Sequence, residues 1–496
     1  MRGGLPSCLK GRGLTAARVL VIIAIIVILI AIGLAAAYVS LSSVSTASTY
    51  NSLTSSTSTA PSSSVTLTTP SVTSAGGNYT SSWLTYHMNL ARDGYDPNEP
   101  SYKTLASVEV WKSPTLDGDI YAEPLIYNGA VYAVTENNSV YALSETTGQV
   151  IWRENLGTPV PGNTLPCGDI DPSGITSTPV IDPTLNEIFV VAYTYPPQHH
   201  VLFALNLHDG STVFQRIVDP PGVSPLVEQQ RAALSLANGI IYIPFGGLAG
   251  DCGQYHGYLL GVNEDNSSAT LSYQVPTGRE GAIWAPAGIG IDSTGIFVST
   301  GNSANDTTFD FGNAVIHLNF SLNETDYFAP TNWASLNDGD TDVGSVEPAL
   351  LGNNTIFQIG KEGVGYLLKE SKLGGIGGQE FSQKLCDASF GGTAYASPVI
   401  YVPCTNGMYA LQINSQKPSF SVNWNRTGFD AGSPIVTGGA VWTIDQNTGM
   451  LYAFDASNGT QVFSYDLGTV VHFESPSSAG GQVFAAGDNS IIAFSV

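Results

Sequence analysis

The sequence predicts an all-β fold, a closed propeller of eight four-stranded, W-shaped blades. Two distant segments, Ala122–Trp152 and Gly432–Phe463, repeat one pattern: a Pro-led strand, a Gly turn, and a hydrophobic strand that runs into Tyr-Ala, followed by another Gly turn and an aromatic strand. The chain also holds 54 Gly and 28 Pro, which supply turns between short strands. A unit of four strands cannot bury both of its faces, so copies must pack against one another around an axis.

The number of blades follows from a recurring pair, a small residue followed by proline, that marks the start of a blade. Clear pairs end at Pro124, Pro179, Pro348, Pro398, Pro434 and Pro476. Two less regular starts, near Ala233 and Ala287, fill the longest gap between these prolines and bring the number of blades to eight. The last unit ends at Val496 without an outer strand. We expect Val108–Pro114 to supply that strand and close the ring, which removes exposed strand edges.

Three segments precede the predicted propeller, which covers residues 83–496. Residues 1–18 hold four cations, and residues 19–39 are an apolar run of the ~20 residues that a membrane-spanning helix needs. Because the cations precede this run, the positive-inside rule predicts a single-pass protein of the cell membrane with an extracellular propeller. A cleaved export signal is the alternative. Residues 40–82 are rich in Ser and Thr and predict a disordered linker.

The charge balance excludes nucleic acid as a partner. Of the 17 Lys and Arg, four lie in residues 1–18, which leaves 13 cations against 40 acids and a net charge of about −27 for the rest. Such a chain repels polyanions and anionic membrane surfaces. Charged residues make up only 11% of the sequence, against ~25% in ordinary soluble domains. A charge-poor, acidic and hydroxyl-rich surface suits an acidic exterior.

Sequons and cysteines both fit an extracellular glycoprotein with disulfide bonds. Nine N-x-S/T sequons occur, at Asn78, Asn137, Asn266, Asn305, Asn319, Asn323, Asn353, Asn425 and Asn458. Cys8 precedes the apolar run, and the other four cysteines allow three pairings in an oxidising compartment. Cys386 with Cys404 is the most local pair, and Cys167 with Cys252 would complete that set.

The repeated pattern resembles the tryptophan-docking repeats of the quinoprotein alcohol dehydrogenase family. Members of that family bind pyrroloquinoline quinone (PQQ) on an eight-bladed propeller. Trp152 and Trp424 take the docking positions, and the segment that begins at Trp83, WLTYHMNLARDGYDP, is similar to the family's W-x-x-Y-x-x-N-x-x-R-x-G motif. The resemblance covers residues 83–496. It implies a PQQ-dependent dehydrogenase of alcohols, sugars or polyols that uses Ca²⁺ or a lanthanide.

The same resemblance implies three metal ligands. Asp251, in GGLAGDCGQYHG, takes the place of a metal-binding acid, and Asn302, in IFVSTGNSAND, takes the place of an Asn that supplies a metal oxygen. Asp342, in NDGDTDVGSVEP, takes the place of the additional Asp in lanthanide-using members. Carboxylate and amide oxygens are the ligands that such hard cations take.

Four further residues are implied at the base and the cofactor. Asp340 takes the place of the catalytic base, and Lys361, in IGKEGVGYLL, that of the cation beside the quinone. Trp284 lies near the place of the Trp that stacks on the cofactor. Arg231 is one of the few cations left for the cofactor's carboxylates.

A non-catalytic propeller at the cell surface is the alternative function, as a scaffold that binds a protein or a glycan. An Asp in a Gly-rich segment is also a common turn residue. The chain has no adjacent cysteines, whereas the family's dehydrogenases carry a disulfide between adjacent cysteines at the cofactor. Convergence of Asp251, Asn302 and Asp340 near the axis would favour the enzyme. The sequence indicates neither the substrate nor the electron acceptor.

Overall fold

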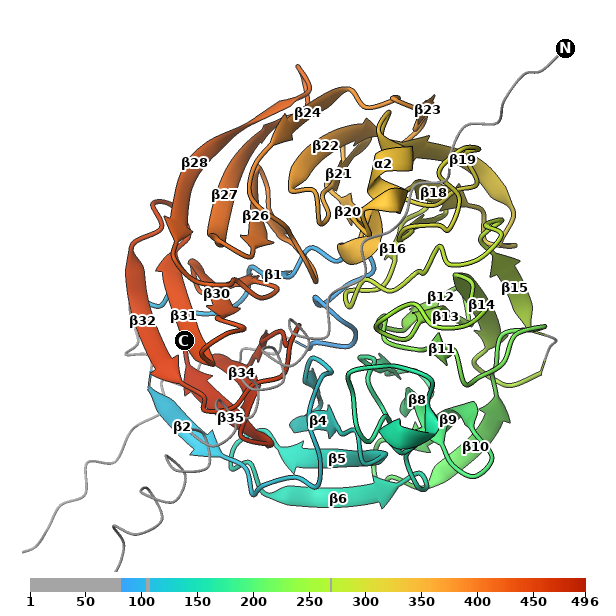
Figure 1. The fold of residues 1–496 in the computed structure, drawn as a ribbon. Coiled ribbons are helices and arrows are strands. Elements are labelled where there is room, and N and C mark those ends of the chain that lie inside the picture. The colour runs from blue at the N-terminus through green and yellow to red at the C-terminus, as the bar shows by residue number, and fades with distance from the viewer. Residues whose placement is uncertain (1–81, 104–107, 268–269) are drawn as a thin grey trace, which may run out of the picture. The chain divides into compact units, whose positions relative to one another are not determined.

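Eight β-sheets surround one axis in the computed structural model, which describes residues 82–103, 108–267 and 270–496 (Figure 1). The predicted number of blades is therefore confirmed. Within the described residues, no helix is both long enough and apolar enough to cross a membrane. The apolar run at residues 19–39 and the predicted linker up to residue 81 lie outside the described residues.

Blades 1 to 4 each place four antiparallel strands in sequence order from the axis outward. Blade 1 holds β3 (Leu125–Tyr127), β4 (Ala130–Val134), β5 (Ser139–Ser144) and β6 (Val150–Asn155). Blade 2 holds β7 (Val180–Asp182), β8 (Glu187–Thr194), β9 (His199–Asn206) and β10 (Thr212–Ile217). Blade 3 holds β12 (Ser235–Ala237), β13 (Ile240–Gly247), β14 (Tyr258–Asn263) and β15 (Leu271–Gln274). Blade 4 holds β16 (Gly290–Ile291), β17 (Ile296–Ser299), β18 (Val315–Leu318) and β19 (Glu324–Ala329).

Blades 5 to 7 repeat this order, and blade 8 draws its outer strand from the start of the domain. Blade 5 holds β20 (Ala349–Leu350), β21 (Thr355–Gln358), β22 (Val364–Lys369) and β24 (Phe381–Lys384). Blade 6 holds β25 (Ala394–Ala396), β26 (Val399–Cys404), β27 (Gly407–Asn414) and β28 (Ser419–Thr427). Blade 7 holds β29 (Ile435–Thr437), β30 (Ala440–Ile444), β31 (Met450–Asp455) and β32 (Gln461–Asp466). Blade 8 holds β33 (Ser477–Ala479), β34 (Gln482–Gly487), β35 (Ser490–Ser495) and β2 (Glu109–Lys112).

A few short elements decorate the blades. Three extra strands pair with blade strands: β1 (Tyr95–Asp96) with β29, β11 (Glu228–Gln229) with β13, and β23 (Gly375–Ile376) with β19. Three short helical turns lie in the connections between blades: η1 (Gly162–Thr164), α2 (Trp333–Asp338) and η2 (Val343–Ser345).

The ring closes as expected, but one blade start differs from the prediction. Strand β2 pairs antiparallel with β35, with Trp111 opposite Ala493, so the two ends of the domain complete blade 8 together. The predicted blade start at Pro398 is wrong, because Pro398 lies in the turn between β25 and β26. Blade 6 instead begins at Ala394, after two glycines and without a leading proline.

The two disulfides follow the pairing that includes the most local pair of cysteines. Cys386 is bonded to Cys404, and Cys167 to Cys252, which confirms this pairing among the three that the sequence allowed. The second bond joins the connection before β7 to the loop between β13 and β14. The two bonds indicate that the propeller folds in an oxidising compartment outside the cytoplasm.

Tryptophans on outer strands connect neighbouring blades. Trp152 on β6 donates its indole N–H to the carbonyl of Leu207 in blade 2 at 2.9 Å, and its ring covers Gly210. Gly210 has φ +74°, a conformation that glycine adopts readily. The same contact recurs between Trp424 and Gly459, as the resemblance implied, and also between Trp111 and Gly148.

Replacing Gly210 by Ala is expected to lower the free energy of unfolding by about 2–4 kcal/mol. A Cβ would lie 2.6 Å from the Trp152 ring, and the left-handed backbone adds its own cost. Urea unfolding measures the loss. Gly222→Ala is the matched control, because Gly222 has φ +83° but no atom within 4 Å of its Cβ position. An equal loss in both variants would show that the Trp152 contact contributes nothing.

Residues 83–96, which we call the plug segment, cross the inside of the ring. Its backbone bonds to the inner strands, or to residues beside them, in blades 1, 2, 4 and 7, through Ile126, Ile181, Ile291 and Val436. Arg92 in this segment is 0% exposed. Its guanidinium donates all of its N–H groups, to Thr85, Tyr86, Leu234, Ser235 and Ile289. The plug segment therefore fastens several blades to one another.

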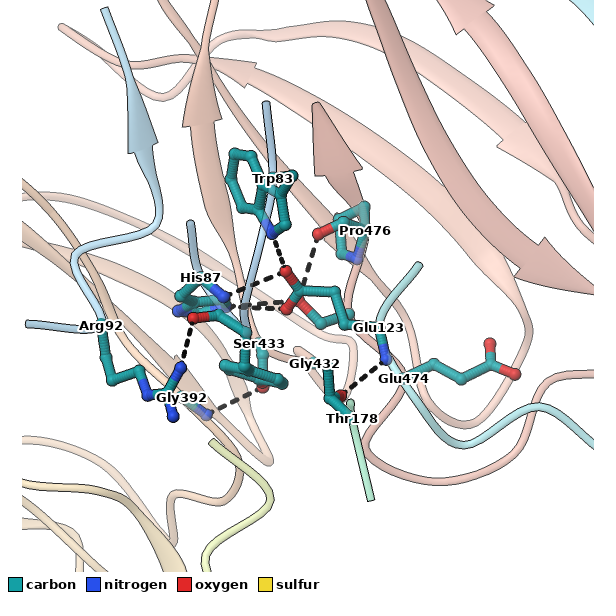
Figure 2. A network of polar contacts seen from close by, with 12 residues as sticks. Trp83, His87, Arg92, Glu123, Thr178, Gly392, Gly432, Ser433, Glu474 and Pro476 are labelled. Carbon is teal, nitrogen blue, oxygen red and sulfur yellow. Dashed lines mark hydrogen bonds and ion pairs between the residues drawn. The ribbon is translucent and has the colours of Figure 1, made fainter. Parts of the chain in front are cut away.

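Two buried acids lie beside the plug segment. Figure 2 shows Trp83 and His87 turned toward Glu123, whose Oε1 accepts hydrogen bonds from the Trp83 indole and from the His87 backbone. Glu347 accepts a hydrogen bond from the backbone N–H of Thr393 at 3.1 Å. Burial raises the pKa of both carboxyls to about 8. Both acids are therefore neutral below that pH.

Candidate functional site

One face of the ring carries the loops between second and third strands and the connections between blades, and these enclose a cavity of about 400 Å³. That volume lies within the ~300–1,000 Å³ of small-molecule sites. All seven side chains implied by the resemblance line it: Arg231, Asp251, Trp284, Asn302, Asp340, Asp342 and Lys361. The structure thus brings together residues of separate blades, including the three whose convergence would favour an enzyme.

Lys361 connects two of the acids. Its Nζ lies 2.8 Å from Asp340 Oδ1 and 2.8 Å from Asp342 Oδ2. Burial acts to lower the pKa of Lys361, but Asp342 and Asp340 outweigh burial, and the pKa is raised. Burial raises the pKa of Asp342 despite the adjacent ammonium. The Asp340 side chain is 63% exposed, so its second oxygen is open to the cavity.

Backbone geometry sets the positions of these acids. Asp340 follows α2 and Gly339 with φ +46°, which turns the chain back toward Lys361. Asp342 Oδ1 accepts a hydrogen bond from the backbone N–H of Asn302 at 2.7 Å. A Cβ at Gly301 would lie 3.1 Å from that same oxygen, so the glycine leaves room for the approach of Asp342.

Asp251 and Asn302 extend the acidic side of the cavity. Asp251 Oδ1 accepts a hydrogen bond from the Tyr255 hydroxyl at 2.5 Å, and the pKa of Tyr255 is raised by burial and then by Asp251. Asn302 Nδ2 donates to Glu280 Oε2 at 3.4 Å. Among the described residues, nothing donates a hydrogen bond to Asp251 Oδ2, and Asn302 Oδ1 likewise accepts none. Both oxygens are therefore available to a ligand.

Glu280 is an acid that sequence reasoning missed. Burial raises its pKa, and Asp251 and Asp342 raise it further against the paired Arg279. Asn302 thus contacts two acids, Glu280 through its side chain and Asp342 through its backbone N–H. Nevertheless, no group of three or more His, Cys, Asp or Glu among the described residues is arranged so that it could hold a metal ion. The metal roles of Asp251, Asn302 and Asp342 remain predictions.

An aromatic wall lies beside the acids. Trp284 donates its indole N–H to Asp342 Oδ2 at 3.2 Å, and Lys361 Nζ lies 5.6 Å from the centre of the Trp284 ring. Phe390 and Phe473 stack on each other at 5.6 Å, and each lies within 6.3 Å of Trp284. The cavity therefore offers flat apolar faces next to charged groups.

A cationic side completes the cavity. Arg231 Nη2 lies 2.6 Å from His472 Nε2, and its guanidinium lies 4.9 Å from the Phe473 ring centre. Burial, and then Arg231, lower the pKa of His472 to about 4, so the imidazole is neutral and accepts the bond from Arg231. Arg231 makes no ion pair with a carboxylate among the described residues. Asp169 and Glu136 act on its charge from beyond ion-pair distance, and the guanidinium still lines the cavity, where an anionic ligand can bind it.

Comparison with known proteins finds a family match and several solved structures with a similar fold. Residues 108–299 match the family described as outer membrane protein assembly factor BamB. A quinohemoprotein alcohol dehydrogenase from Pseudomonas putida HK5 is 12% identical, with a TM-score of 0.65 over 84% of this chain and 80% of that chain. A europium-containing methanol dehydrogenase is 14% identical, with a TM-score of 0.64 over 84% and 98%. BamB from Moraxella catarrhalis is 12% identical, with a TM-score of 0.54 over 79% and 100%.

The protein is a PQQ-like β-propeller. The resemblance that the repeated pattern indicated is thereby confirmed at the level of the eight-bladed fold. Similarity to solved structures at 12–14% identity establishes the fold and leaves the activity open. No curated protein matches this chain.

Several residues in or beside the PQQ-like propeller's cavity carried no signal that sequence reasoning used. Glu280, His472 and Phe473 lie in connections between blades, outside the repeated pattern. Phe390, which also lines the cavity, likewise lies in a connection between blades. A useful signal was available, because Arg279 and His472 are rare residue types in this chain and lie in the connections that precede blades 4 and 8. Connections that hold such residues are where a propeller builds a site.

Proposed function

We propose that the cavity binds PQQ with Ca²⁺ or a lanthanide, and that the protein is an extracellular dehydrogenase of alcohols, sugars or polyols. The observation that supports this function is one cavity with three chemically distinct sides. Asp251, Asn302, Asp340 and Asp342 supply oxygens, Trp284 supplies a flat wall, and Arg231 supplies a cation. PQQ is planar and carries carboxylates, and it needs a hard cation beside its quinone oxygens.

The residues present fit such a group. Trp284 would stack on the ring system, as large aromatic faces do. Arg231, which has no carboxylate partner among the described residues, would bind a cofactor carboxylate. Asp251 Oδ2 and Asn302 Oδ1 would coordinate the cation, because hard cations prefer oxygen ligands. When bound, PQQ supplies the two-electron acceptor that the side chains lack.

Asp340 would take the proton of the substrate hydroxyl. One of its oxygens pairs with Lys361, and the other is open to the cavity. Lys361 holds the carboxylate in position and stabilises its negative charge. General bases of this kind act when they lie within hydrogen-bond reach of the proton. The apolar run at residues 19–39 would tether the propeller to the membrane, and the electron acceptor would be a partner outside the cell.

Addition of PQQ is expected to quench the fluorescence of the purified protein when Ca²⁺ or a lanthanide is present. Trp284 would report the binding, because it forms the wall of the cavity. Trp424, which lies between blades 6 and 7 and not in the cavity, offers a matched control. Trp284→Phe should remove most of the quenching and Trp424→Phe should not. Absence of PQQ binding with either type of metal would eliminate the proposed function.

A scaffold without enzymatic activity is the second candidate. The match of residues 108–299 to a family described as an assembly factor favours it, as does the ammonium of Lys361, which pairs with two of the acids. This candidate expects no PQQ binding. It also expects retention of a surface protein or glycan from the native source that Asp340→Asn does not weaken. Dye reduction on an alcohol would exclude it.

A further inference from the structure

The blade topology sorts the sequons onto two faces of the ring. Turns between first and second strands, and between third and fourth strands, lie on one face, because neighbouring strands in a blade are antiparallel. Loops between second and third strands, together with the connections between blades, lie on the other face and enclose the cavity. We call the first of these the turn face. A sequon's place in its blade therefore fixes its position relative to the cavity.

Three exposed sequons lie on the turn face. Asn353 is in the turn between β20 and β21, Asn323 in the turn between β18 and β19, and Asn458 in the turn between β31 and β32. The Asn353 side chain makes no hydrogen bond to any described residue. The Nδ2 groups of the other two make only local hydrogen bonds, Asn323 to Asn319 at 3.5 Å and Asn458 to Ser457 at 3.4 Å.

A fourth exposed sequon lies on an outer strand. Asn425 is on β28, the outermost strand of blade 6, and its side chain also makes no hydrogen bond within the described part of the chain. Thr427, which completes the sequon, is exposed as well. An acceptor amide here can be reached from solvent without any change in the blade.

Two sequons on the cavity face are different. Asn137, between β4 and β5, is half-buried, and its Nδ2 donates a 2.7 Å hydrogen bond to Asp117. Asn305, between β17 and β18, is half-buried and its Oδ1 accepts hydrogen bonds from the backbone N–H groups of Thr307 and Thr308. A glycan is attached through Nδ2, so on Asn137 it would displace the hydrogen bond to Asp117, at a cost to the folded loop. On Asn305 the Oδ1 bonds would remain, and what separates Asn305 from the exposed sequons is its half-buried position on the cavity face.

We propose that Asn323, Asn353, Asn425 and Asn458 carry N-linked glycans, and that Asn137 and Asn305 do not. In the transfer, the amide nitrogen forms a bond to the anomeric carbon of a lipid-linked oligosaccharide. The bond from that carbon to the lipid phosphate breaks, the phosphate leaves with the electron pair, and the amide proton is released. The glycans would cover the turn face and the rim, and the cavity face would stay accessible. This inference does not depend on a bound cofactor.

Glycopeptide mass spectrometry of the full-length protein from its own source organism tests the proposal. We expect a glycan mass on the peptides of Asn323, Asn353, Asn425 and Asn458, and unmodified peptides for Asn137 and Asn305. Four unmodified peptides from the turn face and rim would overturn the proposal. A glycan on Asn137 would overturn the rule that the cavity face stays free.

A matched pair of variants separates glycosylation from effects on folding. Asn425→Gln removes the acceptor, and Thr427→Ala keeps the acceptor but removes the hydroxyl that the sequon requires, together with one methyl group. Both side chains are exposed, so neither change disturbs the core. Each variant should lose one step of electrophoretic mobility shift and should keep the unfolding temperature of the wild type. Retention of the shift in Thr427→Ala would show that the modification is not sequon-directed, and would overturn the proposal at this site.

Discussion

Asp340→Asn is expected to lower the rate of dye reduction by about 10²–10⁴-fold when PQQ and Ca²⁺ or a lanthanide are supplied. The amide keeps the shape of the side chain but cannot take the proton of the substrate hydroxyl. Cofactor binding should be unchanged, because Lys361 keeps its 2.8 Å contact with Asp342 and the Trp284 wall is intact. Loss of turnover with retained binding is the signature of a base.

Steady-state dye reduction and a fluorescence titration on the same preparation measure the two effects separately. Asp338→Asn is the matched control, since Asp338 is an exposed acid at the end of α2, two residues from Asp340 and outside the cavity. It should keep the wild-type rate. If Asp340→Asn also kept that rate, Asp340 would not be the base. Asp342, the other acid paired with Lys361, would then be the next residue to test.

The fold was largely predictable because it is encoded by repetition. The strands and turns of Gly432–Phe463 have counterparts in the other blades, because each blade solves the same packing problem, and the Trp-over-Gly contact recurs at Trp111, Trp152 and Trp424. The blade start at Pro398 was predicted wrongly because proline followed by a hydrophobic strand is also suited to the turn between β25 and β26. A local pattern cannot distinguish the first strand of a blade from the second when a glycine pair replaces the usual proline.

The cavity was predictable only in the parts that carry a family pattern. Asp251, Asn302 and Lys361 each follow the second strand of a blade within a few residues, so the strand pattern places them on the face that carries the cavity. Glu280 and His472 lie in irregular connections, whose paths depend on contacts with other blades. Periodicity gives no information there. The pairing of Lys361 with two acids was equally invisible, because it depends on distances across separate loops.

A pH effect on stability follows from acids that the fold buries. Besides Glu123 and Glu347, burial raises the pKa of Glu228 to about 8 and that of Glu136 to about 7. One carboxyl oxygen of each of these acids has no hydrogen-bond partner among the described residues. A neutral acid suits such a setting far better than a carboxylate, because an unpaired buried charge is costly.

Stability should therefore fall as the pH rises from 6.5 to 9. In the unfolded chain these acids have pKa values near 4.5, so between pH 4.5 and 8 the folded state binds more protons than the unfolded state. The stabilisation that results is fully present below pH 4.5 and is lost as the pH rises to 8. His87, whose pKa burial lowers to about 3, acts in the opposite sense, but only below pH 6.5. Between pH 6.5 and 9, ionisation of each acid with a pKa near 8 should lower the free energy of unfolding by about 2 kcal/mol.

Urea unfolding at several pH values between 6.5 and 9 measures this loss. Glu347→Gln should keep the wild-type stability at pH 6.5, because the amide oxygen still accepts the bond from Thr393, and it should show a shallower decline. Glu380→Gln, at an exposed acid, is the control and should decline as the wild type does. Stability that stayed level or rose across this range would mean that the buried acids are ionised. Glu123 and Glu347 would then be carboxylates that interact with the Arg92 guanidinium. The buried acids would no longer support the prediction that the protein works in an acidic exterior.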